Sequence, residues 1–215
     1  MKPGKWTTRI VWVVVVFLAL SGVAIVAGRS VSIIQASRTG VEPSDPYDLL
    51  FVQQRLITFA HILPGLLFMV LGPLQFVKRI RARNIGFHRW SGRVLLTSVA
   101  LIGFTALKMG TRAFGGPNET AATYFFTSIF LFAFAKALFH IRRREIAAHR
   151  EWMIRGFSIG LGIVTIRPVV GMYFAFTDMN RLEDVLGIAF WIGFSLHLLA
   201  AEIWIHITRP SRATA

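Results

Sequence analysis

The chain has 215 residues, of which 54% are hydrophobic and only 16% are charged, with a formal net charge of +14. Soluble domains are about one quarter charged, so this composition favours one folded unit in a bilayer over one or two soluble domains. Cysteine is absent, which excludes disulfides, zinc fingers and iron–sulfur clusters, and we predict no metal-ligand site.

Six apolar segments are long enough to be membrane helices, and they predict an all-α integral membrane bundle. In chain order they are Ile10–Ala27, Ile57–Val77, Val94–Met109, Ala121–Ile141, Met153–Phe176 and Val185–Ile207. We interpret the first as an uncleaved helix, because Gly28-Arg29-Ser30 is a poor signal-peptide cleavage site. The polar stretch Ser37–Asp48 predicts an extended loop after this helix.

A ten-residue segment occurs twice. Ile80–Arg89 (IRARNIGFHR) recurs as Ile141–Arg150 (IRRREIAAHR), with six identical residues at an offset of 61. A match at fixed offset is typical of a duplicated unit. We therefore predict that helices two to five are a pseudo-repeat of two helical hairpins whose His-Arg corners share one membrane face. One membrane domain (1–215) then comprises the first helix and extracytoplasmic loop (1–50), the pseudo-repeated four-helix core (51–177) and the last helix with a cytoplasmic tail (178–215).

The basic residues lie mainly in segments that flank the apolar runs. Three are at the N-terminus, six between helices two and three, five between helices four and five, and two in the tail, together 16 of 24. Seven of the ten acidic residues lie in the opposite loops. The positive-inside pattern places both termini in the cytoplasm. This distribution argues against a nucleic-acid partner and indicates contact with the anionic headgroups of the bilayer.

Ionisable side chains within the apolar segments are costly in a bilayer and usually face the bundle interior. With a helical rise of about 1.5 Å per residue, His61, Arg167 and His197 fall at similar depths, which predicts an intramembrane polar layer. Three outcomes are open for Arg167: bonding to helix carbonyls near Pro168, reaching Glu202, or holding an anionic or carbonyl-bearing ligand.

A second polar level lies about 10 Å from the cytoplasmic face. Lys136 and Glu202 match there in depth and are opposite in charge, which predicts an ion pair between the fourth and sixth helices. Gln75 aligns with Lys136 under the offset of 61, so we expect this position to face inward in both hairpins. These three residues form the predicted polar core.

The histidines permit two interpretations. His61 and His197 differ by only about 3 Å in estimated depth, and His88 and His149 lie together on the cytoplasmic side, so a b-type haem between imidazoles is one hypothesis. A histidine in an apolar helix is, however, more often a hydrogen-bonded core residue than a ligand.

The two His-Arg corners suggest a separate chemistry. Each corner lies at the start of a membrane helix, where free backbone N–H groups favour anions. Arg89 and Arg93 flank one start, and Arg150 and Arg155 flank the other. The pattern predicts a site for phosphate, a lipid headgroup or haem propionates, and the structural alternative is two anchored helix starts without a ligand.

One family resemblance covers about residues 57 to 170. It is carried by His61…Gly65…Gly72-Pro73-Leu74-Gln75-Phe76…His88-Arg89-Trp90-Ser91-Gly92-Arg93, by His149–Arg155, and by Arg167. This ordered set resembles a bacterial multi-pass membrane family of unknown function, domain-of-unknown-function family twenty-three-oh-six. The resemblance implies a bacterial cytoplasmic (inner) membrane protein and supplies no activity. A looser similarity to b561-type cytochromes lies in the four-helix core with histidines at two levels, although two well-spaced histidine pairs are absent.

Two functional hypotheses follow. The first is a redox role, with b-type haem or quinone as the cofactor and a membrane redox partner. The alternative is a non-enzymatic binding, transport or assembly protein that recognises an anionic lipid or a small anion. Neither hypothesis assigns a catalytic residue or an oligomeric state.

Overall fold

Helices account for nearly all of the chain in the computed structural model, which describes residues 3–176 and 181–209. Within these ranges the elements are α1 (Lys5–Thr39), α2 (Pro46–Gln53), α3 (Arg55–Phe76), α4 (Lys78–Arg83), α5 (Ile85–Gly110), α6 (Gly116–Arg142), α7 (Ile146–Phe176) and α8 (Leu182–Thr208). Six of them, all except α2 and α4, are long and apolar enough to cross a bilayer. The predicted all-α membrane bundle with six spans is confirmed.

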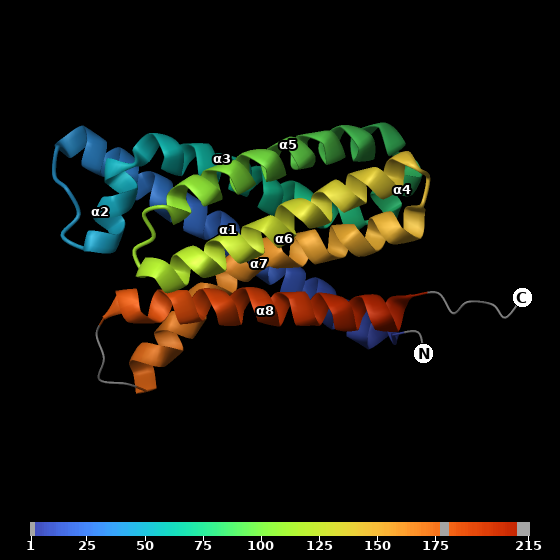
Figure 1. The fold of residues 1–215 in the computed structure, drawn as a ribbon. Coiled ribbons are helices and arrows are strands. Elements are labelled where there is room, and N and C mark those ends of the chain that lie inside the picture. The colour runs from blue at the N-terminus through green and yellow to red at the C-terminus, as the bar shows by residue number, and fades with distance from the viewer. Residues whose placement is uncertain (1–2, 177–180, 210–215) are drawn as a thin grey trace, which may run out of the picture.

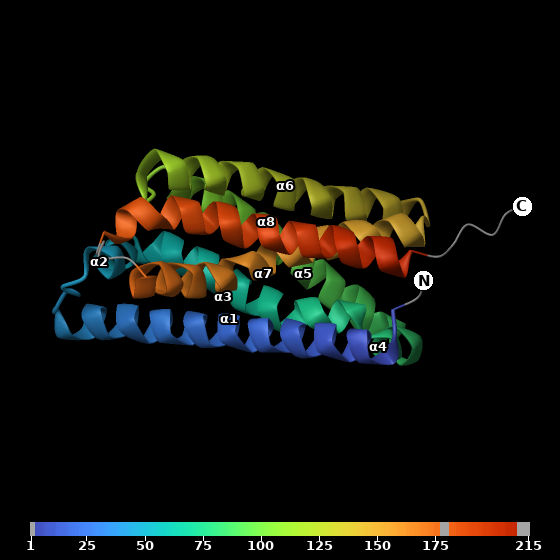
Figure 2. The ribbon, with the colours of Figure 1, turned by 90° about the horizontal axis from the view of Figure 1, so that it is seen from below.

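The long helices run side by side as an elongated bundle (Figure 1; Figure 2). Helix α7 contacts α8, α6 and α1, while α3 packs on α5 and α1. One end of the bundle, here called the basic end, carries α4, the α6–α7 turn, the start of α1 and the finish of α8. The other, here called the α2 end, carries α2 and the α5–α6 turn. Both His-Arg corners therefore lie at one end, as predicted.

The first helix is longer than its apolar run. Helix α1 has 35 residues, which is about 52 Å at the helical rise and exceeds a hydrocarbon core of about 30 Å. The extended loop predicted over Ser37–Asp48 is wrong at both ends. Helix α1 continues to Thr39, and α2 begins at Pro46 because the Asp45 carboxylate accepts the Tyr47 N–H at 3.1 Å.

The third membrane helix also begins earlier than predicted, at Ile85 instead of Val94. The Asn84 side chain caps it by accepting the Phe87 N–H at 2.9 Å. Apolarity alone does not detect this start, because His88, Arg89 and Arg93 occupy the first turns. These basic residues are therefore helical and are not part of a loop.

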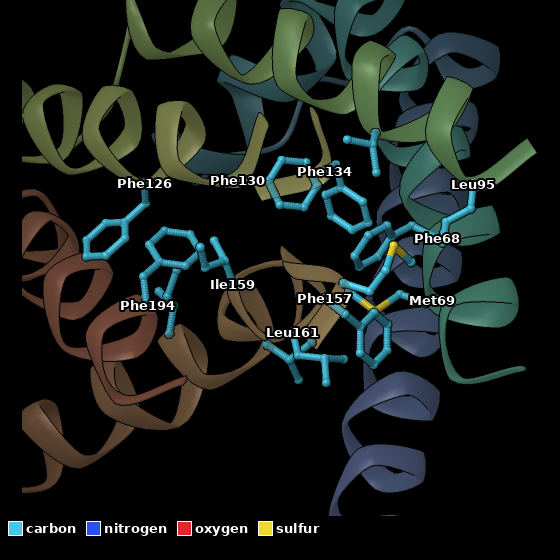
Figure 3. Packing of buried hydrophobic residues seen from close by; sticks show 14 of the residues in the cluster. Phe68, Met69, Leu95, Phe126, Phe130, Phe134, Phe157, Ile159, Leu161 and Phe194 are labelled. Carbon is cyan, nitrogen blue, oxygen red and sulfur yellow. The ribbon is translucent and has the colours of Figure 1, made fainter. Parts of the chain in front are cut away.

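Phenylalanine rings fill the centre of the bundle (Figure 3). Phe68 of α3 is 1% exposed and packs against the rings of Phe130, Phe134 and Phe157, with centroid distances of 5.4–6.1 Å. Glycine makes room for this packing on α7. A Cβ atom added at Gly160 would lie 2.4 Å from the Phe68 ring.

The two repeated segments are similar in one half and different in the other. Helices α5 and α7 begin at equivalent residues, Ile85 and Ile146. Before them, the first copy contains the separate helix α4, whereas the second copy continues α6 as far as Arg142. Gln75 and Ser91 are hydrogen-bonded, and their equivalents, Lys136 and Trp152, are also neighbours. The duplication of whole hairpins stays a prediction.

Candidate functional site

The basic end brings four nitrogen-bearing side chains from α4, α5 and α7 within electrostatic reach of one another. Arg81 of α4 acts on His88 of α5 and on both His149 and Arg150 of α7. The charge of His149 also reaches His88. We call these four residues the basic cluster. It contains residues of both His-Arg corners, which the sequence predicts to lie at one membrane face.

The ring nitrogens of the two histidines are used differently. The Nδ1 of His149 donates to the Ala137 carbonyl at 2.9 Å, which ties α7 to α6. The Nδ1 of His88 is buried and has no hydrogen-bond partner in the described part of the protein. A buried polar atom without a partner costs free energy, so this nitrogen marks a place where a ligand or water would be stabilised.

A buried hydrogen-bond chain lies next to His88. The Gln75 Nε2 donates to the Ser91 hydroxyl at 2.8 Å, and that hydroxyl donates to the Phe87 carbonyl at 2.7 Å. Gln75 is 8% exposed, so the inward orientation predicted for it holds. Gly92 leaves room for the amide, since a Cβ there would lie 3.2 Å from the Gln75 oxygen. These hydrogen bonds fix α3 against the first turns of α5.

Helices α7 and α8 are joined at the same end by polar contacts. Arg150 donates to the Thr208 hydroxyl at 2.9 Å, and Glu151 accepts from Nε and Nη2 of Arg209 at 2.9 and 2.8 Å. Arg155 donates to both carboxylate oxygens of Glu202 at 2.5 and 2.9 Å. The contact with Thr208 sets the position of Arg150 within the basic cluster.

The ion pair predicted between Lys136 and Glu202 is wrong. Glu202 binds Arg155, whose planar guanidinium contacts both carboxylate oxygens at once. Lys136 is half-buried and lies near the rings of Phe139 and Trp152, at 5.1 and 5.9 Å from their centroids. Glu202 is also exposed, so neither it nor Lys136 belongs to a polar core with Gln75.

The four arginines predicted to bind anions differ in their surroundings. Arg89 and Arg93 are exposed and have no carboxylate partner within the described ranges. Arg155 is neutralised by Glu202, so its charge is not available to an anion. Within the described residues, Arg150 is hydrogen-bonded to a neutral hydroxyl, and the charge of Glu151 also reaches it. Of the four arginines, Arg89 and Arg93 on α5 therefore carry the positive charge that is least compensated by carboxylates.

The three residues of the predicted intramembrane layer are not brought together. His61 is hydrogen-bonded to Thr105 of α5 at 2.9 Å, and His197 to Thr165 of α7 at 2.7 Å. No hydrogen bond links His61 to His197 between the described residues, and their helices α3 and α8 do not pack together extensively. Each imidazole is therefore hydrogen-bonded to a threonine on a helix that packs against its own.

Arg167 does not face the interior as predicted. The residue is exposed, and its charge reaches Tyr47 on α2. Pro168 follows it inside α7, and the last turns of this helix diverge from α8 (Figure 1). Of the outcomes predicted for Arg167, contact with Glu202 is not found among the described residues, where Glu202 binds Arg155. The guanidinium lies instead towards the α2 end.

A compact polar cluster attaches α2 to α1 at that end. The Arg29 side chain is 11% exposed, forms an ion pair with Asp48 and lies over the Phe51 ring at 4.2 Å. Burial raises the pKa of the neighbouring Tyr47 phenol, and the charge of Glu119 adds to this effect. These contacts neutralise Arg29 and hold α2 over the end of the bundle.

Sequence reasoning missed two participants. Arg81 is central to the basic cluster, and its only signal is its place in the repeated segment, where it aligns with Arg142. Ser91 is fully buried and completes the Gln75 chain. Both lie within a few residues of His88, but their roles depend on how α3, α4 and α7 meet.

The comparisons with known proteins give a family and no activity. The family model described as "Predicted membrane protein (DUF2306)" matches residues 58–205, which span α3 to α8 and contain the whole basic cluster. No curated protein and no solved structure matches the chain. The match covers more than half of the sequence, and it starts after α1 and α2. The protein therefore belongs to the DUF2306 family of predicted membrane proteins.

Proposed function

We propose that the chain is a non-enzymatic membrane protein that binds a phosphate-bearing anion at the basic cluster. One arrangement carries the proposal: α4 and the starts of α5 and α7 meet at one end of the bundle (Figure 1), and they bring Arg81, His88, His149 and Arg150 together there. Within the described residues, Glu151 is the one carboxylate whose charge reaches His88, His149 or Arg150. Four such groups at one place repel each other when protonated, so an anion between them is stabilised. Guanidinium groups match phosphate oxygens in geometry.

Two further features support an anion at this place. The buried Nδ1 of His88 has no partner within residues 3–176 and 181–209, so it is available to a ligand. Arg89 and Arg93 are exposed beside it on α5, at the level where lipid headgroups meet the helix start. The charge distribution favours an orientation in which the cluster faces the cytoplasm. A bacterial inner membrane is part of the proposal.

The test replaces two cations of the cluster and compares them with two cations of α4 outside it. Arg81→Gln with Arg150→Gln is expected to lower retention of phosphatidylglycerol at least tenfold, measured by native mass spectrometry from nanodiscs. The control, Arg79→Gln with Arg83→Gln, removes the same charge from exposed residues of the same end and should retain the lipid. Equal retention by both variants, with unchanged helical content, refutes the proposal.

A soluble competitor separates the two sources of phosphate. If glycerol 3-phosphate displaces the lipid at millimolar concentration, the site is one for a small anion. If only vesicles containing phosphatidylglycerol compete, the ligand is the bilayer lipid. In both cases the double variant of the cluster should fail to bind, because the same two guanidinium groups hold the phosphate.

The redox hypothesis is the second candidate, and one observation favours it. His197 is hydrogen-bonded through Nε2 to the Thr165 hydroxyl, and its Nδ1 has no hydrogen bond among the described residues, so this nitrogen is available to a ligand. Absorption spectra of the purified protein, oxidised and reduced, test this directly. The haem form of this hypothesis fails if no haem band develops after supplementation with haem.

A further inference from the structure

An open cleft of about 550 Å³ with both polar and apolar lining residues lies at the α2 end, at the opposite end of the bundle from the basic cluster. It lies between the α2–α3 junction and the C-terminal end of α5. Arg55, Lys108 and Arg112 line it together with one carboxylate, that of Glu42. The apolar side chains of Leu56 and Ile57 form another part of its wall, and Leu56 is 84% exposed.

The cations of this cleft lie at the end of the bundle that carries fewer lysine and arginine residues. Lysine and arginine are concentrated at the basic end. At the α2 end Arg29 pairs with Asp48, and Arg181 pairs with Glu183 and Asp184. Two exposed cations outside the cleft, Arg38 and Arg167, have no carboxylate partner among the described residues. Arg55, Lys108 and Arg112 have no carboxylate within salt-bridge distance in the described ranges. Insertion of the helices does not require three unpaired cations on this side, since topogenic charges lie on the other.

The three cations and one carboxylate give the lining a net charge of +2, with both signs present. A ligand that matches both signs carries one anionic and one cationic group, and a phosphate with a primary ammonium group is such a pair. The phosphate would contact the guanidinium groups, and the ammonium would contact the Glu42 carboxylate. Because α3 enters the bilayer at Arg55, the exposed Leu56 beside the cleft lies where acyl chains begin.

We propose that this cleft binds the zwitterionic headgroup of an ethanolamine phospholipid, with the phosphate on Arg55 and Arg112 and the ammonium on Glu42. The site is independent of the basic cluster, because none of its lining residues belongs to that cluster. Variants of the cleft therefore test this proposal, and variants of the basic cluster test the proposed function, independently of each other.

The experiment measures lipid retention from nanodiscs that contain phosphatidylethanolamine, phosphatidylcholine and phosphatidylglycerol. The unchanged protein should retain phosphatidylethanolamine over phosphatidylcholine by at least tenfold, since the quaternary ammonium of choline offers no N–H to Glu42. Arg55→Gln with Arg112→Gln should remove this preference. The matched control, Lys5→Gln with Arg38→Gln, removes the same charge from exposed positions of α1 and should keep it.

A second variant tests the role of Glu42 without removing a cation. Glu42→Gln raises the net charge of the lining to +3, so retention should shift from phosphatidylethanolamine to anionic phosphatidylglycerol. Displacement by soluble glycerophosphoethanolamine would support recognition of the headgroup. It would also indicate that the ligand comes from solution and not from the bilayer. The proposal is overturned if the unchanged protein does not discriminate ethanolamine from choline, or if the cleft variant behaves like its control.

Discussion

Replacement of Gly160 by alanine tests the close packing of α7 against α3. The new Cβ would lie 2.4 Å from Cε1 and Cζ of Phe68, a distance that side chains do not tolerate. The Phe68 ring cannot move away cheaply, because it is 1% exposed and enclosed by the rings of Phe130, Phe134 and Phe157. Forcing an extra methyl group into such a core costs about 1–3 kcal/mol.

The same helix offers a matched control in Gly171, where a Cβ would meet nothing within 4 Å. Both substitutions gain about 1 kcal/mol of helix propensity, so this term cancels in the comparison. Gly160→Ala should therefore be about 1–3 kcal/mol less stable than Gly171→Ala. Reversible unfolding in mixed detergent micelles, followed by tryptophan fluorescence, measures the difference.

A compensating change identifies the contact responsible. Phe68→Leu shortens the side chain that the new Cβ would meet, so it should recover part of the loss in Gly160→Ala, with a coupling of about 0.5–3 kcal/mol in a double-mutant cycle. Equal stability of the two glycine variants, or no coupling with Phe68→Leu, would refute the packing argument.

Three other predictions concern polar contacts of the described residues. Ser91→Ala should cost about 1–3 kcal/mol because it leaves the Gln75 amide buried without its acceptor, and Ser91→Ala with Gln75→Leu should recover most of this loss in the same unfolding assay. Asn84→Ala removes the cap of α5 and should cost about 1 kcal/mol, with faster hydrogen exchange at the Phe87 amide; slower or unchanged exchange would contradict the capping role. Glu151→Gln should destabilise the protein more than Glu202→Gln, because the Glu151 side chain is 17% exposed and that of Glu202 is 47% exposed; the reverse order would show that exposure does not control these pairs.

Much of the architecture could be predicted from the sequence because hydropathy and charge report directly on a bilayer. The length of each apolar run gives the six spans, and the distribution of Lys and Arg places α4 and the α6–α7 turn at one end. Helix limits were less predictable. Apolarity detects only the part of a helix that lies inside the hydrocarbon. The sequence therefore predicts a loop where the polar first turns of α5, with His88 and Arg89, are helical.

The orientation of side chains around each helix could not be predicted in the same way. In a bilayer both the interior and the lipid-facing side of a helix are apolar, so the pattern of apolar residues does not identify the inward face. Depth along the helix axis matched Lys136 with Glu202, but only the packing of α7 on α8 places Arg155 closer to that carboxylate. For the same reason Arg167 was placed in the interior, whereas it is exposed.

Helix α1 lies outside the region that the family model matches, yet it packs on α3 and α7. The matched region contains five crossings, α3, α5, α6, α7 and α8. An odd number of crossings leaves the two ends of that unit on opposite sides of the membrane, and α1 makes the count even. Without α1, the segment before α3 would have to be translocated on its own, or the remaining helices would insert upside down with their arginine-rich turns facing outward. With α1 the described candidate spans become even in number, so that the start of α1 and the finish of α8 lie on the same side of the membrane.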